Sequence, residues 1–267
     1  MTLTHEYPDI KDVTVSLADG VLSVTLNRPD SLNSLSQDML TAVAEAMEAA
    51  AADPAVRVVR LGGAGRGFSS GAGISADDQN AKEHDAEGVL DAANRAVASI
   101  VAVPKPVVAV VQGPAAGVGV SLALACDVVL ASESAFILLA FTKIGLMPDG
   151  GASALVAANI GRIRAMRMAL LAERITATEA YDWGLVSAVY PADELDAAVD
   201  KVITKLRTGP AVALRKTKQA VNDATLTELD NAFAREREGQ LQLLVSNDFR
   251  EGTQAFQQNR RPEFSDQ

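Results

Sequence analysis

Apolar and polar residues alternate over residues 12–29, DVTVSLADGVLSVTLNRP, and the alternation is interrupted once, at Asp19-Gly20. A period of two is typical of a half-buried strand, and Asp-Gly is a strong signal for a tight turn between two strands. Residues 36–53 then change to helical spacing, with Ser36 as a candidate N-cap. The pattern therefore predicts a β-hairpin followed by an amphipathic helix.

The next segments alternate between β-branched runs and helical periodicity. Short apolar runs bounded by glycine, proline or serine predict buried strands, whereas a period of about 3.6 residues predicts helices. Strands are predicted at 56–65, 107–113 and 128–132, and helices at 86–103 and within the small-residue stretch 114–127. This order of strands and helices favours a parallel α/β arrangement.

Beyond residue 150 the chain is predicted to be mostly helical. Residues 194–208 and several segments between 210 and 259 have amphipathic periodicity, whereas 185–190, LVSAVY, reads as a short apolar strand. The strongest change in composition falls at Gly209-Pro210, where a core-like pattern gives way to a charged helical tail. The C-terminal part is therefore expected to be a helical segment.

The charge balance narrows the possible partners. The chain has 267 residues, with 24 basic and 34 acidic side chains and a formal net charge of −10. This length suits one large α/β domain with an appendage, or two small domains. The negative charge argues against nucleic acid as a partner and against adhesion to anionic membranes.

The cysteine content and the N-terminal residues indicate where in the cell the protein is expected. Cys126 is the only cysteine, which excludes an intramolecular disulfide and a cysteine-rich zinc site. No uninterrupted run approaches about 18 apolar residues, so we expect no membrane span. The first residues, MTLTHEYPDIKD, lack the basic and apolar regions of an export signal. The sequence thus predicts a soluble cytoplasmic protein.

Two glycine-rich stretches each follow a predicted strand: 62–75, GGAGRGFSSGAGIS, and 112–121, QGPAAGVGVS. Glycine lets the backbone approach a ligand closely, and N–H groups at such turns can point together at one oxygen. Neither stretch has the Gly-Lys-Ser/Thr ending of a phosphate-binding loop, and the second lacks the spacing of a dinucleotide-binding turn. Taken alone, each is equally compatible with a tight turn or with close helix packing.

Five motifs occur in the order found in a known family: LNRPDSLNSL at 26–35, the two glycine-rich stretches, GLMPDGG at 145–151 and NDFREGTQAFQQNRRPEF at 247–264. On these motifs the chain resembles the crotonase superfamily, also called the enoyl-CoA hydratase/isomerase family. The resemblance implies a crotonase-type α/β fold, with a ββα spiral core over 1–204 and a helical C-terminal segment over 205–267. In such proteins this segment packs against neighbouring copies, so a homotrimer or a dimer of trimers is implied.

The resemblance also implies a ligand, an acyl-CoA thioester whose carbonyl oxygen lies between the backbone N–H groups of Ala72 and Val118. Removing a proton beside a thioester produces an enolate, and one preorganised donor to its oxygen is worth about 10²–10³ in rate. Further substrate contacts are expected at Ser70, Gly71, Gly73, Ile74, Gly117, Gly119, Ser121 and Phe141. Candidates for the CoA phosphates are Arg28, Arg66, Arg260 and Arg261, although each also suits a solvated surface. CoA arrives as part of the substrate, and neither a metal nor a redox cofactor is implied.

The resemblance is incomplete at two positions. Hydratases of this family use two glutamates, and the matching positions here are Ser121 and Phe141. A hydroxyl is a poor general base near neutral pH, and phenylalanine cannot exchange a proton. Isomerase-type members, including ring-epoxide isomerases of phenylacetate breakdown, instead have one acid at the position of Asp149. One carboxylate suffices for isomerisation, because a proton leaves one carbon and returns to another on the same face.

The sequence therefore predicts an acyl-CoA isomerase that acts on an enoyl or ring-derived thioester, with Asp149 moving the proton. Another interpretation of Asp149 is that it is the N-cap of the helix that follows. Two alternative functions also stay open. One is an enoyl-CoA hydratase that works by an atypical route. The other is an acyl-CoA-binding protein without turnover, which the loss of both glutamates would equally explain.

Overall fold

The computed structural model describes residue 7 and residues 12–73 and 86–266. The main sheet has six strands in the order β1-β2-β3-β4-β6-β9. Their bounds are β1 (Val13–Ala18), β2 (Val21–Leu26), β3 (Val58–Gly63), β4 (Val107–Val111), β6 (Val128–Ser132) and β9 (Ala188–Tyr190). β1 and β2 are antiparallel and the other neighbouring pairs are parallel. The predicted hairpin and the predicted parallel α/β arrangement are both confirmed.

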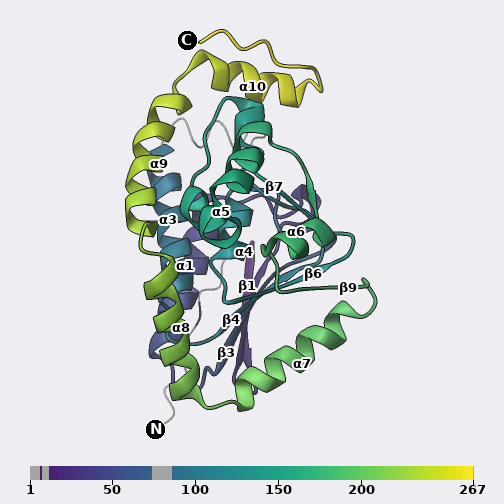
Figure 1. Ribbon diagram of the computed structural model, residues 1–267, viewed down its shortest axis with the longest axis vertical. Helices are drawn as coiled ribbons and strands as arrows, with labels where there is room; N and C mark the ends of the chain where they lie inside the picture. Colours follow the sequence, from purple (N-terminus) through teal and green to yellow (C-terminus); the bar gives the residue numbers. More distant parts are fainter. Residues whose placement is uncertain (1–6, 8–11, 74–85, 267) are drawn as a thin grey trace.

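Helices cover both faces of the central strands β4 and β6, which explains why these two strands are almost continuously apolar, whereas β1 and β2 alternate. In β4, Val107, Ala109 and Val111 belong to the large core cluster that includes residues of α1 and α3, whereas Val108 and Val110 pack on the other face with α7. The bounds of these helices are α1 (Gln37–Ala52), α3 (Ala86–Ala102) and α7 (Leu195–Thr208). Figure 1 shows α7 on the opposite side of the sheet from α1 and α3.

A second sheet has three short strands, β5 (Ala115–Ala116), β7 (Phe136–Leu138) and β8 (Ile175–Thr176). β5 and β7 are parallel, and β7 and β8 are antiparallel. Ser69 forms an isolated parallel bridge with Ala115. Because Ser69 and Ala115 come from the first and second glycine-rich stretches respectively, the second sheet brings these two stretches together.

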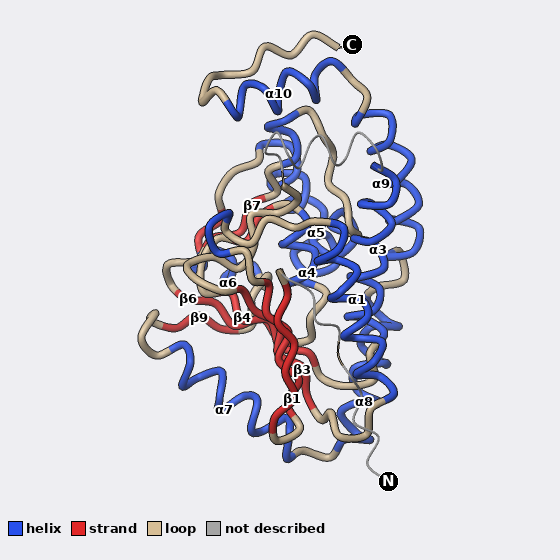
Figure 2. Tube along the Cα trace, turned by 180° about the vertical axis from the view of Figure 1, so that it is seen from behind, coloured by secondary structure: helices blue, strands red, loops and turns tan. Residues whose placement is uncertain are grey.

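The other helices surround the two sheets. They are α4 (Val118–Leu124), α5 (Ala152–Leu171), α6 (Ala177–Trp183), α8 (Ala211–Thr225), α9 (Leu229–Leu244) and α10 (Asn247–Gln257), with the 3₁₀ turns η1 (Pro29–Ser31) and η2 (Phe141–Ile144). α8 and α9 run along the same side as α1 and α3 (Figure 2). The helices predicted between 210 and 259 are confirmed. The boundary predicted at residue 204 falls inside α7 and stays a prediction. Over the described ranges, we find no helix with the length and apolar character that a membrane crossing needs.

A buried ion pair joins α8 to the core. Lys218 Nζ lies 3.0 Å from Asp127 Oδ2, and the Lys218 side chain is only 7% exposed. The same ammonium donates hydrogen bonds to the carbonyl oxygens of Ile100 at 3.0 Å and Lys105 at 3.3 Å, while Asp127 accepts the Val107 N–H at 2.7 Å. Burial raises the pKa of Asp127, and the nearby Lys218 charge opposes that shift. The ion pair therefore anchors α8 to the start of β4.

Lys218→Met is expected to lower the free energy of unfolding by about 1–3 kcal/mol, because Asp127, whose side chain is 20% exposed, and the two carbonyl oxygens would lose their charged donor. Urea unfolding of both proteins measures this difference. Lys216→Met is the matched control, since Lys216 is exposed on the same helix, and it should stay within about 0.5 kcal/mol of the unmodified protein. A loss below about 1 kcal/mol for Lys218→Met would contradict the anchoring role.

Candidate active site

A cavity of about 480 Å³ lies among the second sheet, η2, α9 and α10. This volume is within the range of about 300–1,000 Å³ that small-molecule sites occupy. Phe136, Phe141, Phe249 and Phe256 line it, which is four of the seven phenylalanines in the chain. Among the described residues, the charged and amide side chains on its wall are Lys143, Asp149, Arg174 and Gln240. The cavity therefore suits a largely apolar ligand with few polar contacts.

Ala72 forms an isolated parallel bridge with Leu35, and its own N–H points away from Leu35. Leu35 N donates to Gly71 O at 2.8 Å, and Gly73 N donates to Leu35 O at 3.2 Å. This parallel bridge uses the groups on either side of Ala72, so the Ala72 N–H itself is directed to the opposite side. Gly71 and Ala72 both line the cavity, so this N–H lies at its wall.

Val118 is the first residue of α4, where a helix leaves its N–H without an intrahelical acceptor. Gly117 before it has φ +53° and ψ −134°, a conformation that side chains disfavour. A methyl group on Gly71 would lie 3.3 Å from Gly117 Cα, so the two turns are in direct contact. Across residues 12–73 and 86–266, no protein acceptor receives the N–H of Ala72 or Val118. Gly71, Ala72 and Gly117 line the cavity, whereas Val118 does not, so the two turns place the start of α4 next to the cavity wall.

Asp149 lies in the loop between η2 and α5 and is half-buried at the cavity wall. Its Oδ2 accepts a hydrogen bond from Gln240 Nε2 at 2.7 Å. Its backbone oxygen accepts the Ser121 hydroxyl at 3.0 Å. The carboxylate is thus held by α9 and the backbone by α4, and the side chain borders the ligand space.

The N-cap interpretation of Asp149 is wrong. α5 begins at Ala152 with Gly151 as its N-cap, because Gly150 and Gly151 both have positive φ and delay the helix start. The carboxylate that accepts the first helical N–H groups is that of Glu236, which bonds Gly151 N at 2.6 Å and Ser153 N at 2.8 Å. Asp149 is therefore not required to start the helix.

Glu236 and Gln240 were not predicted as site residues, although the sequence contains a signal for them. Leu229, Ala232, Glu236 and Gln240 share one buried face of α9, so two polar residues interrupt an apolar stripe. Burial raises the pKa of Glu236, and hydrogen bonds from Ser153 and Gly151 oppose that shift. A buried polar pair at helical spacing indicates partners elsewhere in the fold.

The two positions that match the hydratase glutamates lack carboxylates at the cavity. Phe141 lines the cavity and is 8% exposed. Ser121 is fully buried and its hydroxyl is engaged by the Asp149 backbone. Within the described part of the chain, Asp149 is the only carboxylate on the cavity wall. The described part of the wall therefore offers one acid for proton transfer, not two.

The structure brings part of the predicted set together. Ser70, Gly71, Ala72, Gly117, Phe141 and Asp149 line the cavity. Gly119 instead packs against Ser69, since a methyl group there would lie 2.8 Å from Ser69 Cβ. Gly73 is buried and pairs with Leu35, and Ile74 lies outside the described residues.

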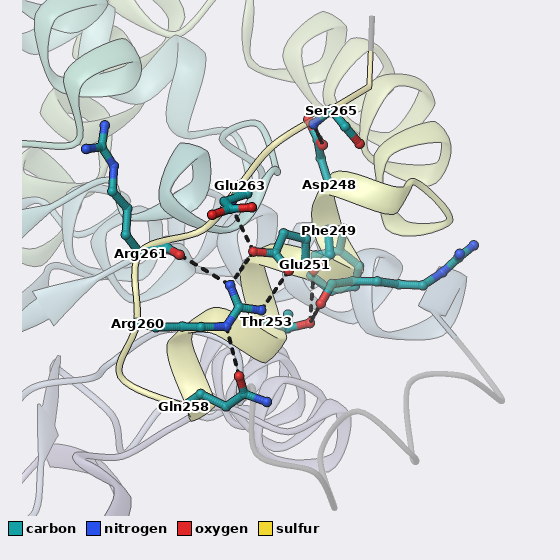
Figure 3. A network of polar contacts seen from close by, with 10 residues as sticks. Asp248, Phe249, Glu251, Thr253, Gln258, Arg260, Arg261, Glu263 and Ser265 are labelled. Carbon is teal, nitrogen blue, oxygen red and sulfur yellow. Dashed lines mark hydrogen bonds and ion pairs between the residues drawn. The ribbon is translucent and has the colours of Figure 1, made fainter.

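Of the predicted phosphate contacts, two arginines are engaged within the protein. Arg28 Nη1 donates to Ser34 O at 3.2 Å. Arg260 Nη2 bonds Glu251 Oε2 at 2.7 Å, and this pairing lowers the pKa of Glu251 to about 2. Figure 3 shows Arg260 turned toward Glu251, whereas the Arg261 side chain points away from this cluster.

Two other cations were missed by sequence reasoning. Lys143 on η2 and Arg174 before β8 are exposed and line the cavity, and the Arg174 guanidinium lies 4.4 Å from the Phe136 ring centroid. Arg66, a predicted phosphate contact, is exposed within the first glycine-rich stretch. The residue type alone does not distinguish the cations that line the cavity from those on the rest of the surface.

Replacing Glu236 by leucine is expected to lower the free energy of unfolding by about 1–3 kcal/mol, because the N–H groups of Gly151 and Ser153 would lose their acceptor. Differential unfolding in urea measures this loss. Glu238→Leu, at an exposed position of the same helix, controls for the change of charge. Equal stabilities of the two variants would show that Glu236 does not hold the start of α5.

Comparison with known proteins identifies the family of this chain. The sequence profile of the enoyl-CoA hydratase/isomerase family matches residues 16–267. The 1,2-epoxyphenylacetyl-CoA isomerase of Escherichia coli is 37% identical over 254 residues, covering 92% of this chain and 95% of that protein. A probable enoyl-CoA hydratase of Rhodobacter capsulatus is also 37% identical over 254 residues, covering 95% of this chain and 97% of that protein.

A crystal structure of a related protein has the same fold. The crystal structure of an enoyl-CoA hydratase from Mycobacterium avium subsp. paratuberculosis is 65% identical with a TM-score of 0.91, covering 97% of this chain and all of that one. The predicted crotonase-type α/β fold is therefore confirmed. The relatives' names include isomerases and hydratases, so they establish a family and leave the reaction open. The chain belongs to the enoyl-CoA hydratase/isomerase family of acyl-CoA enzymes, the crotonase superfamily.

Proposed function

We propose that this protein is an acyl-CoA isomerase that moves a double bond, or isomerises a ring, within the acyl group of its substrate. The observation that carries the proposal is the single carboxylate on the described cavity wall, Asp149, together with Ser121 and Phe141 at the two hydratase positions. Water addition by the usual route needs two acid–base groups, whereas isomerisation needs one.

The proposed reaction proceeds in two proton transfers. With a 3-enoyl-CoA, the Asp149 carboxylate removes a proton from C2, and the electrons of that C–H bond delocalise onto the thioester oxygen. The N–H groups of Ala72 and Val118 stabilise the resulting dienolate. Asp149, now protonated, returns the proton to C4, and the double bond moves to C2–C3. The product has the same atoms as the substrate.

The proposal needs no metal or redox cofactor, since CoA enters as part of the substrate. The four phenylalanines on the cavity wall support an apolar or aromatic acyl group, because such groups gain most from burial beside them. Lys143 and Arg174 on the same wall support a substrate with an anionic group, and we assign this group to the CoA phosphates.

A homotrimer or dimer of trimers, located in the cytoplasm, belongs to the same proposal. The second half of α5 supports self-association, because Ile163, Met166 and Leu170 are 77%, 41% and 62% exposed and follow one helical face. Exposed apolar patches of this kind mark interaction surfaces. Sedimentation velocity at micromolar concentration tests the assembly, and a monomer would contradict it.

Product analysis tests the reaction. Purified protein is offered 3-enoyl-CoA and 2-enoyl-CoA separately, and products are resolved by mass and retention time. We expect 3-enoyl-CoA to become 2-enoyl-CoA without gain in mass. If 2-enoyl-CoA gains one water instead, the protein is a hydratase, the second candidate that the hydratase names of some relatives favour. Binding of acyl-CoA without chemistry on enoyl or phenylacetate-derived thioesters would favour a non-catalytic binding protein.

A further inference from the structure

One side chain that contacts the Asp149 carboxylate comes from the C-terminal helices. Gln240 on α9 donates a hydrogen bond from Nε2 to Asp149 Oδ2 at 2.7 Å. Gln240 is 1% exposed, and its side chain lines the same cavity as Asp149. Neither proton transfer of the proposed reaction explains why a buried glutamine lies at this position.

The orientation of the Gln240 amide is determined by the backbone of Met147. Its Oε1 accepts the Met147 N–H at 3.2 Å, and its Nε2 donates to Met147 O at 3.0 Å. Because one end of the amide can only accept and the other can only donate, these two bonds fix which atom is nitrogen. The second hydrogen of Nε2 is then directed at Asp149. The bond to the carboxylate is thus set by the fold and does not depend on a choice of amide rotamer.

Glu236, four residues earlier on the same helix, fixes the chain on the other side of Asp149. It accepts the N–H groups of Gly151 and Ser153. α9 therefore holds the backbone both before Asp149, at Met147, and after it, at Gly151. The position of the carboxylate is consequently tied to α9, which is part of the helical C-terminal segment.

We infer that Gln240 is a positioning residue for the proposed proton transfer, and that its amide N–H both orients the Asp149 carboxylate and favours its ionised form. This inference rests on the proposed function of Asp149 as the base. A hydrogen bond donated to a carboxylate stabilises the charged form over the protonated one, so the donor keeps Asp149 ready to accept a proton at lower pH. It also limits the orientations of the carboxylate relative to the bound thioester.

Other charged groups of the described elements share the surroundings of Asp149. Lys143 on η2 and Arg174 before β8 line the same cavity, and Glu236 lies one turn away from Gln240 on α9. These three groups are unchanged in a Gln240 variant. A shift in pH dependence on replacing Gln240 would therefore report the lost N–H donor.

The test is the pH profile of kcat/KM for isomerisation of 3-enoyl-CoA by Gln240→Met. Methionine is similar in length and volume but has no N–H to donate. We expect kcat at the plateau to fall by roughly 10- to 100-fold, with little change in KM, since orientation is lost. Losing a donor to the carboxylate should also raise the pH below which kcat/KM falls, the acid limb of the profile, by roughly one to two pH units. Activity would thus be lost at a higher pH than in the unmodified enzyme.

Gln242→Met is the matched control, because Gln242 is exposed on the same helix, and its profile should coincide with that of the unmodified enzyme. If Gln240→Met does not fold, Gln240→Glu is measured in its place. Glutamate keeps the side-chain length and the acceptor for Met147 N–H, but it places a second carboxylate beside Asp149. Repulsion between the two should move the acid limb further upward.

An acid limb that stays in place overturns the inference, whether or not kcat and the melting temperature fall, because a merely structural role lowers both without moving the limb. Asp149→Asn is assayed alongside. If that variant is inactive while Gln240→Met has an unchanged profile, the inference about Gln240 fails and the proposed function stands. If Asp149→Asn remains active, the proposed function itself fails.

Discussion

Asp149→Asn is expected to lower kcat for the isomerisation of 3-enoyl-CoA by roughly 10²–10⁴-fold, the usual contribution of a positioned acid–base group. Asparagine has the same shape, and its oxygen can still accept the hydrogen bond from Gln240 Nε2. What it cannot do is take up the C2 proton and return it to C4. KM should change less than kcat, because the lost interaction forms during proton transfer and not in substrate binding. Steady-state kinetics with separation of the two enoyl isomers measures both constants.

Asp182→Asn is the control for loss of one negative charge. Asp182 is exposed on α6, away from the residues that line the cavity. We expect its kcat to match that of the unmodified enzyme. An Asp149→Asn enzyme with kcat within about threefold of this control would exclude Asp149 as the base, given the effect that acid–base groups normally have.

Gly71→Ala should have the second large effect, a fall in kcat/KM of at least about 10²-fold. Gly71 has φ +87°, and a methyl group there would lie 2.8 Å from Ala116 O and 3.3 Å from Gly117 Cα. The two turns would have to separate, which moves the Ala72 and Val118 N–H groups away from a common oxygen. Kinetics with 3-enoyl-CoA, together with calorimetric binding of a saturated acyl-CoA, distinguishes lost catalysis from lost binding.

Gly161→Ala separates this effect from backbone strain. Gly161 also has positive φ, +73°, but a methyl group there meets nothing within 4 Å. Strain of about 1–3 kcal/mol is expected at both positions, whereas only Gly71 touches the site. If Gly71→Ala and Gly161→Ala lose similar amounts of stability and both retain kcat/KM, the assignment of the two N–H donors is contradicted.

Sequence reasoning was most successful where the signal is local. The hairpin turn at Asp19-Gly20 and the Ser36 N-cap follow from residues a few positions apart, and both are confirmed. The strands β3, β4 and β6 lie within the predicted ranges because β-branched apolar runs bounded by glycine or proline leave few alternatives. Asp149 was singled out because a motif placed it, and the structure brings its side chain to the cavity wall.

The support for Asp149 could not be predicted in the same way. Gln240 lies 91 residues from Asp149, and Glu236 lies 85 residues from Gly151. Helical periodicity assigns Glu236 and Gln240 to the buried face of α9, but only the tertiary packing of α9 shows what they bond. The sequence pattern thus indicated buried polar groups without identifying their partners.

Charged residues were the weakest part of the prediction for a related reason. Arg260 was a candidate for the CoA phosphates, yet in the fold it pairs with Glu251. Lys143 and Arg174 come from segments without a recognisable motif and line the cavity. A long cationic side chain has many reachable partners, and the residue type does not say which one it meets.

The central claim is that one carboxylate moves a proton within the acyl chain and that no water is added. The most direct measurement uses 3-enoyl-CoA labelled with deuterium at C2, converted in a single turnover by excess unmodified enzyme and, in parallel, by Asp149→Asn. We predict that the unmodified enzyme gives 2-enoyl-CoA with no added water and with part of the deuterium at C4, and that the variant gives no product in the same time. A product heavier by one water, or equal product formation by Asp149→Asn, would contradict the account.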